Sequence, residues 1–402
     1  MADPISWYAL GRLVNDPETI LEAVDTKVLT HNLDPSAHGQ ENEVVWAHRV
    51  EPLLDHLSYT IYNIKLNPAA RVFKAIVGSG LEGDFTTIQA AIDWANLYGG
   101  GTIFIKNGIY TLAADLTLYS NISLLGEDND STIIDCGNAS NSLRAVGVLG
   151  THLRNITIEN VKIRNNTSTT EGAIYFSYVD DSFIKDCIFT NNINSGAGYG
   201  QDIKLSNCQR ILIETNYSYD SDTFVDTNAG GSIIVRNNAV SNVLNDAIEL
   251  DSSYAVQVVL NSIDTTGNSG IILTGCNFCK VALNDLGGIT DYGVYLNNSP
   301  RNVIATNTFW DSGASSESIR LASTTTYVTI VGNSIGANNT KGIHFVGGDK
   351  CVISGNVIAD CDIDAVDLDS GCDYNIVTNN QFLGSGYTDG GTGNVFANNI
   401  DV

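Results

Sequence analysis

One residue type recurs at nearly equal intervals through the second half of the 402-residue chain, and this repeat limits the available folds. Each unit has an apolar residue, two further residues, an Asn, one more residue and a second apolar residue, as in Val258 to Ile263. The Asn positions are 216, 238, 261, 284, 307, 333, 356, 380 and 399, with Asp186 one unit earlier. Most intervals are 22–24 residues, and two are 26 and 19. Such a period is typical of a solenoid, in which each coil buries its apolar side chains against the next.

A second apolar pattern, with the alternation of a short β-strand, follows most of these Asn residues by about ten positions, as in Ala247–Leu250 and Gly293–Leu296. Helical or leucine-rich repeats would show a 3.6-residue period or Leu-rich units instead. We therefore predict an all-β fold, a right-handed single-stranded parallel β-helix of about 10–12 coils with a small helical N-terminal region. The Asn column is expected at a turn, where Asn tolerates a positive φ and its amide can bond to the same amide one coil away.

Three regions divide the chain. Residues 1–75 are predicted to be a helical N-terminal attachment or neck region, with one helix starting at Asp16 and Pro17. Residues 76–135 are predicted to hold a capping helix, with Asp84 as its N-cap, and the first coils. Residues 136–402 are predicted to be the parallel β-helix, and its eight Cys residues are expected to be buried free thiols.

The charge balance excludes several classes of partner. The chain has 20 Lys and Arg against 45 Asp and Glu, a formal net charge of −25. Nucleic acids and anionic membranes bind through clusters of basic residues, so neither is an expected partner. No apolar run approaches the length of a membrane span, and the first residues lack the pattern of a secretory signal peptide.

The middle residue of the second pattern should point outward, because side chains alternate along a strand. The resulting column consists of Tyr175, Lys204, Asp226, Glu249, Ile272, Tyr295, Arg320, His344 and Asp367. Aromatic rings suit sugar faces, so this column is the candidate saccharide-binding face. The expected substrate-binding residues are Tyr175, Lys204, Asp246, Tyr295, Arg320 and His344. Small residues on the same strands, Ala247, Gly270, Gly293, Gly342 and Ala365, are expected to face outward and leave room for a ligand.

Asp226, Glu249 and Asp251 are the candidate catalytic residues. Stacked one coil apart, their carboxyls should crowd and raise the pKa of one of them, as a general acid requires. Direct stacking would suit a retaining glycosidase and a diagonal pair an inverting one. No metal is expected at this cluster, and a solvated acidic face remains the alternative. A second acidic group, Asp364, Asp367 and Asp369, could hold Ca²⁺ through oxygen ligands.

Two parts of the chain resemble known families. Asp84–Ala95, Gly99–Tyr110 and Ser120–Gly126 resemble the opening of the pectate-lyase-like β-helix superfamily, which includes pectin-active enzymes, polysaccharide epimerases and bacteriophage tailspikes. Val28–Gly39 resembles the N-terminal regions of phage tail proteins. The resemblance implies a tailspike or tail fibre: a homotrimer that binds a bacterial surface polysaccharide, with its N-terminal region attached to the virion tail. Such a protein reaches the outside of the cell without a signal peptide.

Three functions follow as hypotheses. The first is a tailspike-like protein that recognises, and in an enzymatic form hydrolyses, a surface polysaccharide. The second is a non-catalytic carbohydrate-binding or structural fibre of the same shape. The third is a pectin-type lyase or epimerase. Lys204 beside Asp226 is the nearest approach to a lyase arrangement, so hydrolysis is ranked above elimination.

Overall fold

The computed structural model describes residues 74–78, 83–168, 170–194, 200–310, 316–322, 324–336 and 340–402. The predicted helical region 1–75 lies outside these residues, apart from Lys74 and Ala75, which begin the first strand instead of ending a helix. Within the described ranges, no helix has both the length and the hydropathy needed to cross a membrane.

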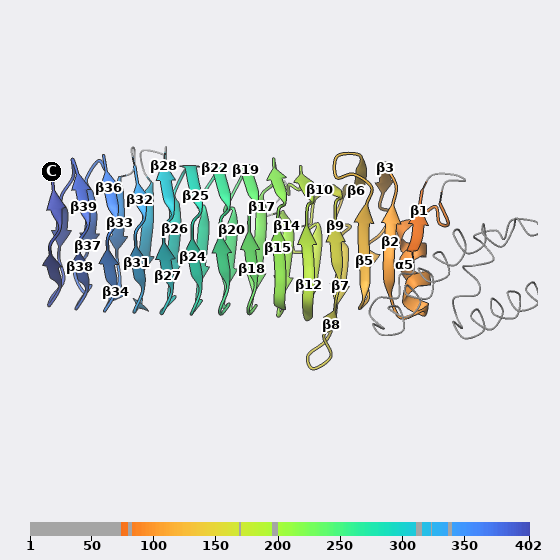
Figure 1. Cartoon of the computed structure of the whole chain (residues 1–402), viewed down its shortest axis with the longest axis horizontal. Coiled ribbons are helices and arrows are strands. Elements are labelled where there is room, and N and C mark those ends of the chain that lie inside the picture. Colours follow the sequence, from red (N-terminus) through yellow and green to blue (C-terminus); the bar gives the residue numbers. More distant parts are fainter. Residues whose placement is uncertain are drawn as a thin grey trace, which may run out of the picture. The chain divides into compact units, whose positions relative to one another are not determined.

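The described chain winds into a parallel β-helix with three long sheets (Figure 1), which confirms the predicted fold. Sheet A consists of β1 (Lys74–Val77), β2 (Gly101–Ile105), β5 (Ile122–Gly126), β8 (Leu153–Arg154), β9 (Thr157–Glu159), β12 (Val179–Lys185), β15 (Gln209–Glu214), β18 (Ile234–Arg236), β21 (Gln257–Val259), β24 (Lys280–Ala282), β27 (Val303–Ala305), β31 (Thr329–Val331), β35 (Val352–Ser354), β38 (Ile376–Thr378) and β41 (Val395–Ala397).

Sheet B consists of β3 (Gly108–Thr111), β6 (Thr132–Ala139), β10 (Lys162–Asn166), β13 (Ile188–Thr190), β16 (Tyr217–Tyr219), β19 (Ala239–Val243), β22 (Ser262–Thr266), β25 (Asp285–Ile289), β28 (Thr308–Trp310), β32 (Ser334–Ile335), β36 (Val357–Ala359), β39 (Gln381–Leu383) and β42 (Ile400–Asp401).

Sheet C consists of β4 (Leu116–Thr117), β7 (Leu143–Val146), β11 (Ile174–Ser177), β14 (Gln201–Ser206), β17 (Thr223–Asn228), β20 (Ile248–Asp251), β23 (Ile271–Thr274), β26 (Tyr292–Asn297), β29 (Glu317–Ala322), β33 (Lys341–Phe345), β37 (Asp364–Leu368) and β40 (Tyr387–Asp389). Its 12 strands, one from each coil, lie within the predicted 10–12 coils. β30 (Thr325–Thr326) and β34 (Gly348–Asp349) pair separately between sheets C and A.

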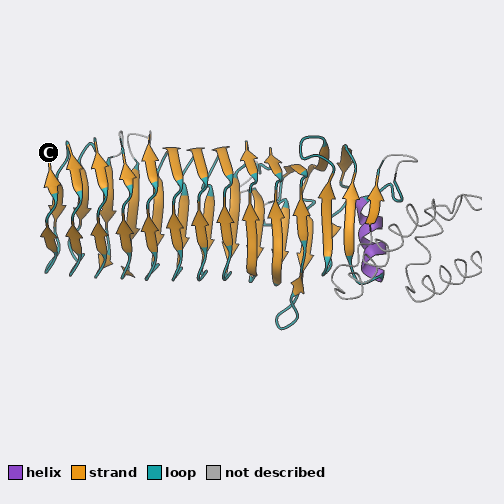
Figure 2. Ribbon diagram, in the orientation of Figure 1, coloured by secondary structure: helices purple, strands orange, loops and turns teal. Residues whose placement is uncertain are grey.

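Helix α5 (Ile88–Leu97) covers the N-terminal end of the stack (Figure 2). It buries Ile88, Ala91, Ile92 and Ala95 and packs against β1, β2, β4 and β5, so the first coil does not expose its apolar cross-section. The predicted N-cap was wrong. Thr87 holds that position and its hydroxyl accepts a hydrogen bond from the Ala90 amide, whereas Asp84 accepts one from the amide of Ile76 in β1.

The Asn column forms a continuous ladder of side-chain amides inside the coils. Asn261 Nδ2 donates to Asn284 Oδ1 at 3.0 Å, and the same bond joins each ladder Asn to the next, from Asn216 to Asn399. The expected positive φ belongs to the residue before each Asn, as at Leu260 (φ 60°) and Leu283 (φ 58°). The ladder residue faces inward instead, because its amide must reach the neighbouring coils.

One coil before Asn216, the ladder position belongs to Cys187 and not to Asp186. The Cys187 amide donates to Asn216 Oδ1 at 3.0 Å, and Asp186 occupies the preceding turn position with φ 55°. All eight Cys residues are free and buried, as expected from their apolar surroundings. Burial raises the pKa of the Cys187 thiol to about 12, so it packs as a small apolar residue.

Candidate functional site

The outward column predicted on sheet C is continuous in the structure. Parallel pairing joins Tyr175 to Lys204, Lys204 to Asp226, and Asp226 to Glu249. The same register continues through Ile272, Tyr295, Arg320, His344 and Asp367. Adjacent strands of a sheet lie about 4.8 Å apart, so these side chains form a row along the solenoid.

The small residues expected beside this row do not face outward. Ala247 and Ala365 are fully buried, and a Cβ placed on Gly293 would lie 2.6 Å from the Phe309 ring in the core. These positions follow the corner that leads into sheet C, where the backbone comes too close to core side chains for a larger residue. They therefore leave no space for a ligand on the outer face.

Four carboxyls and one lysine form what we call the acid centre, on β14, β17, β20 and the turn before β20. Its members are Lys204, Asp226, Asp246, Glu249 and Asp251. Lys204 Nζ lies 2.8 Å from Asp226 Oδ2, so one carboxylate has a direct counter-charge. Glu249 is the register partner of Asp226 on the next strand and forms no ion pair with a residue that the structure describes.

The pKa of Glu249 is raised to about 7, first by burial and then by the negative charges of Asp226 and Asp246. Lys204 lowers the pKa of Glu249 but does not cancel these effects. The crowding expected from the sequence therefore acts in the predicted direction, although burial contributes more than the like charges. A carboxyl with this pKa can donate or accept a proton near neutral pH, as general acid–base catalysis requires.

The neighbours of Glu249 differ in how they are held. Asp246 accepts a hydrogen bond from the Ser269 amide at 2.8 Å, and burial raises its pKa. Asp251 follows Glu249 by two residues on β20 and accepts a hydrogen bond from the Ser252 hydroxyl at 2.9 Å. All three candidate catalytic residues thus lie on β17 and β20, and Asp246 lies at their edge.

Tyr175 and Tyr295 lie on opposite sides of the acid centre, each two coils from its nearer carboxyl in the column. Tyr295 stacks on Tyr292, with ring centroids 5.0 Å apart and an interplanar angle of 25°. The Arg144 guanidinium lies over the Tyr175 ring, 5.7 Å from its centroid. Two coils correspond to roughly 10 Å, so an extended chain of sugar rings could touch both aromatic positions while crossing Glu249.

A second charged group on sheet C, the paired network, consists of Glu317, Arg320, Lys341, His344 and Asp367. Glu317 Oε1 lies 2.9 Å from His344 Nδ1, and both Glu317 oxygens accept hydrogen bonds from Arg320, at 3.0 and 3.1 Å. Burial alone would raise the pKa of Glu317, but His344 and Arg320 outweigh it and lower that pKa. The sequence analysis missed Glu317 and Lys341, which precede the alternating part of their strands.

The predicted calcium ligands do not come together as a group of three. The side chains of Asp367 and Asp369 lie near His344, and ligand atoms of these three residues lie within 4.8 Å of one another. Asp364 instead accepts a hydrogen bond from the Thr388 hydroxyl. The Lys341 ammonium lies 2.5 Å from Asp367 Oδ2, so a lysine already supplies a positive charge beside this group.

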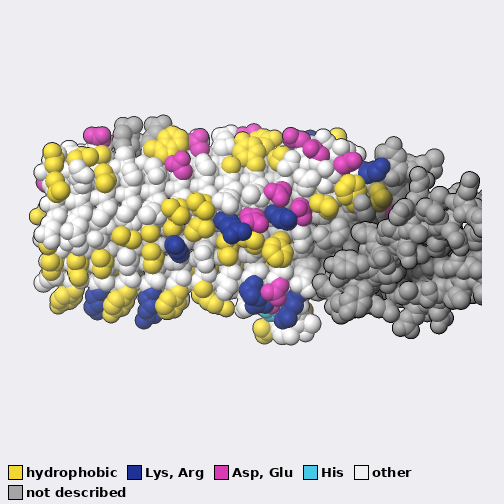
Figure 3. All heavy atoms as spheres, in the orientation of Figure 1, with side chains coloured by type: hydrophobic (Ala, Val, Ile, Leu, Met, Phe, Trp, Pro, Cys, Tyr) yellow, Lys and Arg dark blue, Asp and Glu magenta, His cyan; other side chains and the backbone are white. Residues whose placement is uncertain are grey.

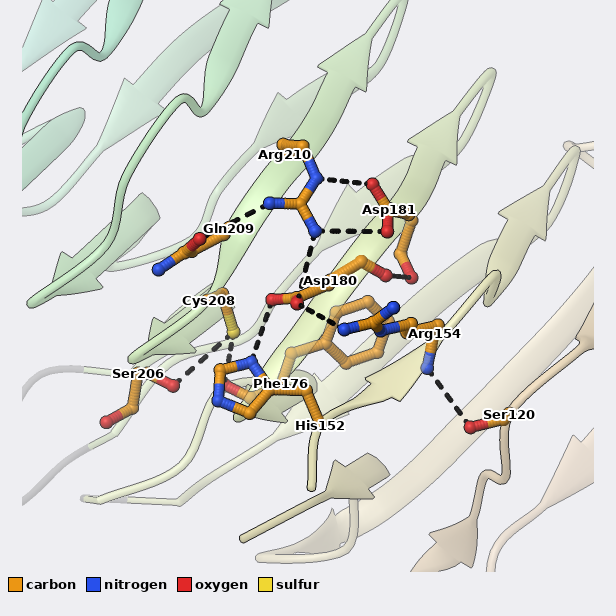
Figure 4. Close-up of polar contacts among 11 residues, drawn as sticks. Ser120, His152, Arg154, Phe176, Asp180, Asp181, Ser206, Cys208, Gln209 and Arg210 are labelled. Carbon is orange, nitrogen blue, oxygen red and sulfur yellow. Dashed lines mark hydrogen bonds and ion pairs between the residues drawn. The ribbon is translucent and has the colours of Figure 1, made fainter. Parts of the chain in front are cut away.

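A third group of polar residues joins β8, β12 and β15 at the corner between sheets C and A (Figure 4). The buried Asp180 carboxylate lies 2.9 Å from His152 Nδ1 and 3.2 Å from an Arg210 nitrogen. Arg210 also binds Asp181, and Arg154 lies 3.8 Å from Asp180. These ion pairs join the start of β8 to β12 and β15. The sequence analysis did not find them, because the coils here are less regular in length than those after Asn216.

Comparison with known proteins supports the fold and identifies a family. Residues 190–399, just over half of the chain, match the family model described as periplasmic copper-binding protein (NosD). No curated protein matches the sequence.

Three solved structures are similar to this chain, and for each we give the sequence identity, the TM-score and the share of each chain that is covered. DFA-IIIase from Arthrobacter chlorophenolicus A6 is 14% identical with a TM-score of 0.60, and the match covers 78% of this chain and 94% of that one. The surface adhesin PfbA of Streptococcus pneumoniae is 16% identical with a TM-score of 0.58, over 82% and 91%. The catalytic unit of a GH87 alpha-1,3-glucanase from Streptomyces thermodiastaticus strain HF3-3 is 15% identical with a TM-score of 0.60, over 76% and 65%. At these identities the likeness establishes the fold alone.

Proposed function

The chain belongs to the family described as periplasmic copper-binding protein (NosD), and from this premise and the geometry of sheet C we propose that it binds a polysaccharide outside the cytoplasm and hydrolyses it. One observation carries the proposal: Glu249, with its pKa raised to about 7, lies between two aromatic positions and beside Asp226, which forms an ion pair with Lys204. Glycoside hydrolysis requires one protonated and one ionised carboxyl across the scissile bond.

The described residues do not fit copper, which the family description names. Copper sites in proteins favour imidazole, thiolate and thioether ligands. Within the described ranges, the Cys side chains are buried inside the coils, and the one candidate metal group has a single His, two carboxylates and Lys341 beside it. The reaction proposed for the acid centre therefore involves no copper ion.

In the proposed reaction, the Glu249 carboxyl donates its proton to the glycosidic oxygen as the bond to the sugar carbon breaks. The Asp226 carboxylate, held by Lys204, stabilises the positive charge that develops on the sugar ring. In the inverting alternative, Asp226 takes a proton from a water molecule that attacks this carbon. In the retaining alternative, Asp226 bonds to the carbon, and a water molecule deprotonated by Glu249 then displaces Asp226 and releases the sugar. Asp246 and Asp251 lie near Glu249 and contribute to the rise in its pKa.

The neighbouring structures favour one further candidate, a non-catalytic binding protein, because one of them is a surface adhesin. A pectin-type lyase or epimerase is less favoured, because the Lys204 ammonium that would assist proton removal is paired with Asp226 at 2.8 Å. Lyase products would carry a double bond that absorbs in the near ultraviolet, and a calcium-dependent lyase or epimerase would lose activity on chelation.

The test is to replace Glu249 and compare cleavage with binding. Reducing ends are measured after incubation with a panel of bacterial surface polysaccharides and neutral glucans. We expect Glu249→Gln to lower the rate by about 10²- to 10⁴-fold while binding persists, because Gln cannot donate a proton to the leaving group. Ser262→Ala, an exposed position on β22 of sheet B, is the matched control. Unchanged turnover in Glu249→Gln would overturn the site. Binding without cleavage by the wild type would favour the adhesin-like function.

We also propose that the protein is a tailspike-like homotrimer attached to a virion tail through residues 1–75. The support is the resemblance of Val28–Gly39 to phage tail proteins, which lies outside the described residues. Native mass spectrometry of the full chain tests the assembly. Three copies of the 43.0 kDa chain are expected, and a stable monomer would contradict the tailspike proposal without affecting the site on sheet C.

A further inference from the structure

Five consecutive coils place an exposed aromatic or basic side chain at the same corner between sheets C and A. We call this row the corner ladder: Phe278, Arg301, Tyr327, Lys350 and Tyr374. Backbone hydrogen bonds stack these positions, since the Arg301, Tyr327 and Lys350 amides each donate to the next coil. Aromatic and basic residues alternate without exception along the ladder. Figure 3 shows this alternation of hydrophobic and basic side chains along the lower edge of the molecule.

The aromatic rings are presented to solvent. Phe278 and Tyr374 are each 62% exposed and Tyr327 is 51% exposed. Arg301 lies over the Phe278 ring and Lys350 over the Tyr327 ring, each 5.7 Å from the ring centroid. The cations therefore hold the rings in place without covering them, because large parts of these rings remain accessible.

The backbone at this corner is unfavourable for such residues. All five have φ between 55° and 59°, a conformation that favours Gly and Asn and is uncommon for bulky side chains. At the corner before the Asn ladder, the same conformation is held by Asn or Gly in some coils, as at Asn237 and Gly332, and by Leu in others, as at Leu260 and Leu283. Backbone preference therefore does not explain why five successive coils carry large side chains here.

The charges of the ladder are also unusual for this chain. Most basic side chains in the described part of the chain form ion pairs, but Arg301, Lys350 and the nearby Lys280 form none with a described carboxylate. The closest acidic residues in sequence, Asp349 and Asp373, accept hydrogen bonds from backbone amides. In a chain with a net charge of −25, these cations are available for an external anion.

We propose that the corner ladder binds an acidic polysaccharide, separately from the acid centre. Its aromatic residues would stack on sugar rings, and Arg301, Lys350 and Lys280 would pair with the carboxylate or sulfate groups between them. Rings two coils apart are separated by roughly 10 Å, so a linear polymer lying along the edge would meet rings and cations alternately. Single-stranded nucleic acid uses similar contacts, so tighter binding of an oligonucleotide than of either acidic polysaccharide would overturn the proposal.

The test uses polygalacturonate, dextran sulfate and neutral dextran as probes, with affinity measured by titration calorimetry on the full chain. The wild type should bind at least one of the two acidic polymers, and binding should weaken in high salt. Neutral dextran should not compete for this site. A preference for polygalacturonate would assign the ligand as a carboxylated polymer, and a preference for dextran sulfate as a sulfated one.

Two sets of variants separate the proposal from a structural role. Arg301→Gln with Lys350→Gln should weaken binding at least tenfold, as should Phe278→Asn with Tyr327→Asn, in which Asn suits the positive φ and keeps the fold. The matched control, Lys185→Gln with Arg236→Gln, makes the same charge change on sheet A at residues paired with glutamates. Three outcomes would overturn the proposal. The wild type does not bind either acidic polymer, both ladder variants bind with unchanged affinity, or the variants lose self-association while binding persists. Glu249→Gln should leave this binding intact.

Discussion

The acid centre and the paired network lie on the same face of sheet C, with their nearest strands, β20 and β29, three coils apart. They differ in how their charges are compensated. In the acid centre, Glu249 faces other carboxyls and its pKa is raised to about 7. In the paired network, Glu317 accepts hydrogen bonds from Arg320 and His344, and its pKa is lowered. Glu317 is buried and Glu249 is half-buried, so burial alone would raise both pKa values and the partners decide the direction of the shift. One row of charged residues on this solenoid therefore contains a glutamate suited to proton transfer, Glu249, and a glutamate that stabilises the fold through ion pairs, Glu317.

The largest expected effect distinguishes the two glutamates by stability. Glu317→Gln should lower the free energy of unfolding by about 3 kcal/mol, because Arg320 and His344 lose a buried counter-charge. Glu249→Gln should leave it unchanged or raise it at pH 7, because a carboxyl without an ion-pair partner is replaced by a neutral group. Chemical denaturation of both variants measures the difference. Equal losses would show that Glu249 also has a stabilising partner.

A smaller effect comes from the pH dependence of stability. Glu249 has an ordinary pKa of 4.5 when unfolded and about 7 when folded, so its favourable contribution is complete below pH 4.5 and is lost as the pH rises through 7. Glu317 acts oppositely, because its contribution is present at neutral pH and is lost on acidification. The free energy of unfolding of the wild type should fall between pH 4.5 and pH 8. In Glu249→Gln, this fall should be smaller by on the order of 1 to 2 kcal/mol. Denaturation at several pH values tests this, and parallel curves would contradict it.

The smallest effect sharpens the role of Lys204. Because the active form of Glu249 is protonated, hydrolysis should decline as the pH rises above about 7. Lys204 lowers the pKa of Glu249, so Lys204→Met should move this decline to higher pH by less than about one unit. The pH dependence of kcat/KM measures the shift. A movement to lower pH would show that Lys204 does not act on Glu249.

The sequence allowed the fold and the outward column to be predicted because both depend on periodicity. Asn residues spaced by one coil set the register, and alternation then placed Asp226 and Glu249 side by side. Where a coil departs from the regular pattern, periodicity did not predict which charged residues meet. Glu317 and Lys341 precede the alternating residues, and Asp180 meets Arg210 and His152 across coils of unequal length. The inward direction of Ala247 depends on how the corner turns, which no local pattern records.

The Asn ladder also has a consequence for the length of the molecule. Each side-chain amide bonds to the ladder amides of the coils before and after it and to a backbone carbonyl of the preceding coil, so the arrangement at one position repeats at the next. Whole coils could therefore be added or removed in steps of about 4.8 Å without redesigning the remainder. The coil between Asn307 and Asn333 already has 26 residues and keeps the ladder bond at 3.0 Å, so extra residues are accommodated outside the ladder. The length of the solenoid can therefore change in evolution, one coil at a time, without altering the sites on its surface.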